Sequence, residues 1–150
     1  MPVEKLTIII AEDDDGHASL LRRNLERANT GAAFMRVRNG QELIELLSRE
    51  INGELSGRSA VVLLDIDMPK MGGVEALAAI KLNPALRQIP VYMLTTTDNP
   101  AEVSRCFRAG CNAYLMKPVS YQQFIAAIER LSAFLQVAQH PTLTSDHASA

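Results

Sequence analysis

Acidic side chains follow directly on two short apolar stretches of this sequence. Residues 12–15 are four consecutive acids after the run 6–11. Asp65 and Asp67 come at the end of the run 61–64. Runs this short and rich in branched apolar residues are typical of strands buried on both faces, as in a parallel sheet. The carboxyl ends of such strands share one edge, where ligands bind, so the spacing predicts a carboxylate cluster there.

Two more polar side chains are expected at the same edge. Thr95 follows the run 89–94, and Lys117 follows the run 112–116. Converging carboxylates repel one another unless a cation neutralises them, and a site with only oxygen ligands favours Mg²⁺. Lys117 and Thr95 are suited to hold the oxygens of a phosphoryl group. Asp65, central in the cluster, is placed to attack phosphorus as a nucleophile.

Helix capping is a simpler explanation for single acids in this set. Asp is favoured at helix N-caps and in turns. Asp65 or Asp67 could therefore cap the helix expected after residue 72, and Asp14 or Asp15 could cap the helix that follows them. Capping and cation binding are compatible in the first acidic run. For Asp65, the other reactive side chains expected at the strand ends favour a role in a ligand-binding site over helix capping.

Five apolar strands alternate with five helices along the chain. We expect strands near 6–11, 32–37, 61–65, 89–94 and 112–116, and helices near 16–29, 40–51, 73–82, 100–109 and 120–137. This alternation predicts a doubly wound α/β fold, with a parallel five-stranded sheet and helices on both faces. In the fourth helix, Val103, Cys106 and Phe107 are expected to face the core.

Length and composition predict a single globular domain. The chain has 150 residues, 47% of them hydrophobic, and we assign residues 1–139 to the domain and residues 140–150 to a flexible tail. A net charge of −2 without basic runs argues against nucleic-acid binding. Neither a membrane span nor a secretory leader is evident, so a cytoplasmic location is expected. Cys106 and Cys111 fit no metal motif and are expected to be reduced.

Taken together, these features resemble the receiver domain of two-component response regulators, the CheY-like superfamily. The resemblance covers the chain from about Leu6 to Val137. Its marks are the acidic pair Glu12-Asp13, Asp65 in Leu-Leu-Asp-x-Asp-Met-Pro with Gly72-Gly73, Thr95, and Lys117-Pro118 preceded by Tyr114. Each mark alone is weak, but together and in this order they are highly specific. The resemblance implies a (βα)5 flavodoxin-like fold with strand order 2-1-3-4-5.

The resemblance implies a role for each acid. Asp65 would accept a phosphoryl group from a sensor histidine kinase, a histidine phosphotransfer protein or a small donor such as acetyl phosphate. Mg²⁺ would be held by Asp13 and Asp65, by Glu12 through water, and by the backbone carbonyl of Asp67. Many receivers have an uncharged residue in place of Asp67, so its carboxylate is expected to affect the lifetime of the phosphorylated form.

The resemblance also implies a conformational switch. Lys117 would pair with the phosphoryl oxygens, and Thr95 would move to hydrogen-bond them. Tyr114 would then turn inward and remodel the face formed by the fourth helix, the fifth strand and the fifth helix. The alternative for Tyr114 is a half-buried ring with its hydroxyl in water. Receivers often pair through this face, so a homodimer is a hypothesis here.

The output expected from this chain is contact with other proteins. We expect no effector domain after Val137. The long loop Asn52 to Ser59 and the segment 111–118 resemble small stand-alone regulators of phytochrome-type kinases. His17 is expected to be a solvated surface residue. These features predict a signalling phosphoacceptor rather than an enzyme.

Two other functions fit part of this pattern of residues. The Asp65-x-Asp67 motif also resembles haloacid-dehalogenase phosphatases, which are magnesium-dependent and use an Asp nucleophile. In those enzymes that motif comes first and the acidic pair last, whereas here Glu12-Asp13 precedes it, and no cap domain fits in the chain. The other alternative is a receiver-like binding module that takes no phosphate, against which the complete set of site residues argues.

Overall fold

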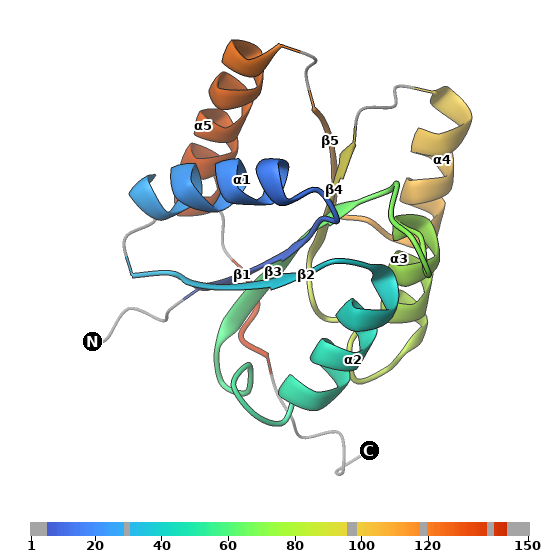
Figure 1. Ribbon diagram of the computed structural model, residues 1–150. Helices are drawn as coiled ribbons and strands as arrows, with labels where there is room; N and C mark the ends of the chain where they lie inside the picture. The colour runs from blue at the N-terminus through green and yellow to red at the C-terminus, as the bar shows by residue number, and fades with distance from the viewer. Residues whose placement is uncertain (1–5, 29–30, 96–98, 118–119, 138–139, 144–150) are drawn as a thin grey trace.

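The structure is a computed structural model that describes residues 6–28, 31–95, 99–117, 120–137 and 140–143. Pro118 lies outside the described residues. Strands and helices alternate along the chain (Figure 1) as β1 (Leu6–Ala11), α1 (Asp15–Ala28), β2 (Ala33–Val37), α2 (Gly40–Glu50), β3 (Ser59–Asp65), α3 (Gly73–Leu82), β4 (Val91–Thr95), α4 (Pro100–Ala109), β5 (Ala113–Met116) and α5 (Tyr121–Val137). The described residues contain no helix long and apolar enough to cross a membrane.

The strands form one parallel sheet in the order β2-β1-β3-β4-β5. This confirms the predicted flavodoxin-like α/β fold. Helices α1 and α5 lie on one face of the sheet, and α2, α3 and α4 lie on the other (Figure 1). Every residue of β3 is buried, as expected for a central strand covered on both faces.

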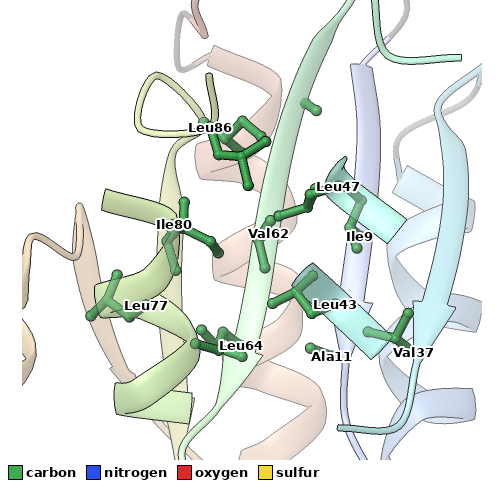
Figure 2. Packing of buried hydrophobic residues seen from close by; sticks show 14 of the residues in the cluster. Ile9, Ala11, Val37, Leu43, Leu47, Val62, Leu64, Leu77, Ile80 and Leu86 are labelled. Atoms are coloured by element: carbon green, nitrogen blue, oxygen red, sulfur yellow. The ribbon is translucent and has the colours of Figure 1, made fainter. Parts of the chain in front are cut away.

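Two apolar cores flank the sheet because successive strand residues point to opposite faces. Val62 and Leu64 of β3 face one core, where they pack with Leu43 of α2 and Leu77 of α3 (Figure 2). Val61 and Leu63 face the other core, which α1 and α5 cover. This packing fixes the position of the strand ends and of the side chains that follow them.

The inward face of α4 differs from the prediction. Cys106 is fully buried, but Phe107 is 52% exposed. Neighbouring helix residues point about 100° apart, so one cannot face the core as squarely as the other. The predicted helix boundaries are close: Asn99 caps α4, Pro100 is its first residue, and Gly110 ends it with a positive φ of 104°.

The chain beyond α5 differs from the expected flexible tail over residues 140–143. Leu143 is fully buried in the core beneath α2 and α3. Its backbone N–H donates to the carbonyl of Arg58 at 2.8 Å, and its own carbonyl accepts from Gly57 at 2.9 Å. The hydroxyl of Tyr92 lies 3.1 Å from Nε2 of His140. The rest of the predicted tail, residues 144–150, lies outside the described residues.

Leu143→Ala is expected to lower the free energy of unfolding by about 2–5 kcal/mol, because it leaves a cavity at a fully buried site. The same change at Leu82, which is 82% exposed, should alter stability by no more than about 0.5 kcal/mol. Urea denaturation of both variants measures the difference. Equal stability of the two variants would show that residues 140–143 do not pack on the domain.

Candidate functional site

Three carboxylates converge at the carboxyl edge of the sheet. Glu12 and Asp13 follow β1, and Asp65 is the last residue of β3. One carboxylate oxygen from each of the three lies within 4.8 Å of the others. Glu12 is 2% and Asp65 8% exposed, whereas Asp13 faces solvent. The sequence prediction of a carboxylate cluster at this edge agrees with this geometry, and its hard oxygen donors fit a divalent cation.

A buried lysine completes the cluster. Lys117, only 4% exposed, donates from Nζ to Oε1 of Glu12, and its Nζ lies 3.5 Å from Oδ2 of Asp65. Its backbone N–H donates to the carbonyl of Thr95 at 2.7 Å, which ties the end of β5 to β4. The predicted cluster therefore includes Lys117, but the partner of its ammonium group is a carboxylate of the acidic pair.

Burial and charge shift the two buried carboxyl groups in opposite directions. Burial raises the pKa of Asp65 to about 7, with the neighbouring Glu12 carboxylate adding to the rise and Lys117 opposing it. Burial also acts to raise the pKa of Glu12, but the hydrogen bond and charge of Lys117 outweigh it and hold that pKa below its usual value. The site thus carries closely spaced negative charge that a cation would stabilise.

The remaining predicted residues surround this cluster. Thr95 is fully buried at the end of β4. It follows Leu94, which pairs with Asp65 in the sheet. Asp67 is exposed, and its backbone N–H donates to Oδ1 of Asp65 at 3.3 Å. Tyr114 of β5 is half-buried and packs against the core under α3 and α4.

The capping alternatives are resolved by the helix starts. Asp14 accepts from the N–H of His17 at 2.9 Å, so Asp14 caps α1 as one interpretation predicted. The N-cap of α3 is Gly72, and no side chain caps that helix. The hypothesis that Asp65 or Asp67 merely caps α3 is therefore wrong.

Two glycines let backbone segments approach closely beside Asp65. A Cβ at Gly73 would collide with the backbone carbonyl of Asp65. A Cβ at Gly40 would lie 2.5 Å from the carbonyl oxygen of Met71, which accepts the N–H of Gly40 at 2.9 Å. These contacts fix the loop between β3 and α3.

Sequence reasoning missed two side chains at the site. Arg36 of β2 donates from Nε and Nη2 to the carbonyl oxygen of Glu12, at 3.0 and 2.7 Å. The sequence signal for Arg36 was its charge within a strand that is otherwise apolar. His17 was expected to be solvated, and its side chain is 46% exposed, but its Nδ1 lies 3.8 Å from Oε1 of Glu12 and its ring packs beside Phe124.

The protein thus has a doubly wound α/β fold with three clustered acids and a buried lysine at the carboxyl edge of its sheet. The pattern of the response regulator receiver domain family matches residues 8–129. The chain belongs to this family of two-component signalling domains.

Three relatives illustrate the similarity. Response regulator Rcp1 of Synechocystis is 30% identical over 127 residues, 85% of this chain and 86% of that protein. The structure of its Mn²⁺-bound form matches with a TM-score of 0.81 over 90% of this chain and 98% of that one, at 29% identity. A receiver domain from Rhodospirillum rubrum matches with a TM-score of 0.84 and 38% identity, covering 93% and 99% of the two chains. The phosphorylated cyanobacterial phytochrome response regulator RcpA matches with a TM-score of 0.82 and 28% identity, covering 93% and 99%.

Proposed function

We propose that this protein accepts a phosphoryl group on Asp65 from a histidine kinase or a histidine phosphotransfer protein, and signals in the cytoplasm. The observation that carries the proposal is the side chain of Asp65, buried at the end of β3 beside Lys117 and the acidic pair. Membership of the receiver family and the phosphorylated form of RcpA support it.

The proposed reaction is a substitution at phosphorus. A carboxylate oxygen of Asp65 forms the new P–O bond while the P–N bond of the phosphohistidine breaks and the imidazole leaves with the electron pair. Lys117 would pair with the phosphoryl oxygens, and Thr95 would donate a hydrogen bond to them. The ammonium group of Lys117 has three N–H donors, so its bond to Glu12 leaves donors for the phosphoryl oxygens.

The residues present fit a magnesium ion. Asp13 and Asp65 would hold it directly, Glu12 through water, and Asp67 through its backbone carbonyl. When bound, Mg²⁺ would neutralise the charge that gathers as phosphorus approaches Asp65. The oxygen donors of Glu12, Asp13 and Asp65 support this assignment, as does the Mn²⁺-bound form of Rcp1.

The first test is the intact mass of the protein after incubation with acetyl phosphate. With Mg²⁺ we expect a gain of one phosphoryl group, labile to hydroxylamine as an acyl phosphate is, and with excess EDTA we expect no gain. A protein that binds Mg²⁺ but takes no phosphate from acetyl phosphate or from a phosphorylated kinase would instead be a receiver-like binding module. Turnover of phosphomonoesters would favour the phosphatase alternative.

Phosphorylation is proposed to act on the face formed by α4, β5 and α5. Thr95 and Tyr114 would switch together and change the contacts of this face. The face exposes apolar side chains, with Phe107 at 52%, Met116 at 43% and Phe134 at 47%. We expect two copies to pair through it once Asp65 is phosphorylated. Sedimentation at several concentrations, with and without acetyl phosphate, measures this, and a monomer under all conditions would rule it out.

A further inference from the structure

The side chain of Arg36, on the edge strand β2, binds the acidic turn that carries Glu12 and Asp13. The guanidinium of Arg36 donates from Nε and Nη2 to the carbonyl oxygen of Glu12, at 3.0 and 2.7 Å. Its third nitrogen, Nη1, donates to Oδ1 of Asp15 at 2.7 Å. Arg36 therefore bridges the residue before Asp13 and the first residue of α1.

The register of the sheet explains why this strand position reaches the turn. Arg36 pairs with Ile10 of β1, and Val37 pairs with Ala11. Alternation along β2 turns Val37 toward the core under α2 and Arg36 toward the face that α1 covers. The N–H of Glu12 donates to the carbonyl of Val37 at 3.1 Å. Both backbone polar groups of Glu12 are thus bound by two consecutive residues of β2.

The partial burial of Arg36 makes this arrangement rigid. Its side chain is 23% exposed, compared with 57% for Arg38, whose Nη1 also contacts Oδ1 of Asp15, at 2.9 Å. The planar guanidinium fixes two directions at once, which a lysine ammonium does not. Arg38 brings a similar charge to Asp15, but within the part of the chain that the structure describes it is Arg36 whose side chain binds the carbonyl oxygen of Glu12.

We propose that Arg36 is a positioning residue that fixes the backbone of residues 12–15 and so sets the affinity of the carboxylate cluster for Mg²⁺. The magnesium part of this inference rests on the proposed function. Asp13 follows the carbonyl that Arg36 binds, so the bridge limits where the Asp13 carboxylate lies relative to Asp65. Groups that orient metal ligands contribute on the order of 10-fold or more to metal affinity.

The direction of the change in Mg²⁺ affinity distinguishes a positioning role of Arg36 from a purely electrostatic one. Removing a cation near a metal site favours metal binding, because one repulsive charge is lost. If Arg36 acts by positioning the metal ligands, its removal weakens metal binding. Arg36→Gln is expected to weaken Mg²⁺ binding by on the order of 10-fold. Arg38→Gln also removes one positive charge beside Asp15, but it leaves the bonds of Arg36 to Glu12 in place. This variant is expected to bind Mg²⁺ as tightly as the wild type or more tightly.

Calorimetric titration with Mg²⁺ and thermal unfolding without added metal test this on four proteins: wild type, Arg36→Gln, Arg36→Lys and Arg38→Gln. Arg36→Lys keeps the charge and guards against a failure of Arg36→Gln to fold; its affinity is expected to lie between those of Arg36→Gln and the wild type. Weakened binding in a variant that unfolds at the same temperature as Arg38→Gln supports positioning. Wild-type affinity in both Arg36 variants overturns the inference and leaves the proposed function intact.

Amide hydrogen exchange of residues 13–18 without added metal gives a second, independent readout. The N–H groups of His17 and Ala18 both donate to Asp14, so their protection reports the order of the turn. Exchange on the order of 10-fold faster in Arg36→Gln than in Arg38→Gln is expected. If the wild type binds no Mg²⁺, the magnesium part of the proposed function fails, and this readout still decides whether Arg36 fixes the turn.

Discussion

Replacing Asp65 with asparagine is expected to abolish phosphoryl transfer to this protein. The amide has nearly the same shape as the carboxylate but is not a nucleophile toward phosphorus, and it carries no charge to share a cation. Labelling by acetyl phosphate with Mg²⁺ should fall by at least about 1,000-fold, the scale typical of removing a nucleophile. Intact-mass measurement over time gives the labelling rates of the wild type and of Asp65→Asn.

Asp67→Asn is the matched control. Asp67 is exposed and follows Asp65 by two residues, so the same chemical change there removes a charge and leaves the proposed nucleophile in place. This variant should still be labelled, and its phosphorylated form should persist several-fold longer, since about 1 kcal/mol of repulsion between like charges is removed. Labelling of Asp65→Asn at the wild-type rate would show that another residue accepts the phosphoryl group.

Replacing Lys117 with methionine is expected to have the largest effect on stability. Nζ of Lys117 is the buried cation that bonds to Glu12 and lies 3.5 Å from Asp65. Methionine fills similar space but leaves a buried carboxylate without its counter-charge. At pH 7 the free energy of unfolding should fall by about 3–5 kcal/mol, as is typical when one partner of a buried ion pair is removed.

The stability lost in Lys117→Met should become smaller as the pH falls. In the wild type, Lys117 holds the pKa of Glu12 below 4.5, so this pair stabilises the fold above that pH and the contribution is lost as the pH falls through the lowered pKa. In Lys117→Met, burial instead disfavours the charged form of Glu12, and protonation relieves the cost. Urea unfolding between pH 7 and pH 4 should therefore show the two proteins converging in stability as the pH falls.

Lys81→Met provides the comparison for that experiment. Lys81 is partly buried, and its Nζ donates to the backbone carbonyls of Arg87 and Ile89, at 3.1 and 2.6 Å, and not to a carboxylate. Its loss should cost about 1–3 kcal/mol with little change between pH 4 and pH 7. If the loss in Lys117→Met were equally independent of pH, Glu12 would not be the group that Lys117 stabilises.

The order of strands and helices, and the side chains at the strand ends, could be predicted from local patterns in the sequence. Short apolar runs ending in polar residues specify strands of a parallel sheet, and the carboxyl ends of such strands meet at one edge. This is why Asp65, Thr95 and Lys117 could be assigned to one region before the structure was known. These signals are local, because each depends only on residues that are close together in the sequence.

The partners of these side chains, in contrast, depend on how the whole domain packs. The bond between Lys117 and Glu12 joins residues 105 positions apart, and Arg36 reaches the carbonyl of Glu12 across 24. The outward turn of Phe107 and the burial of Leu143 were likewise missed. Such contacts depend on strand register and on which surfaces are buried, and these follow from the packing of the whole domain, because a residue's neighbours in sequence do not specify its neighbours in space.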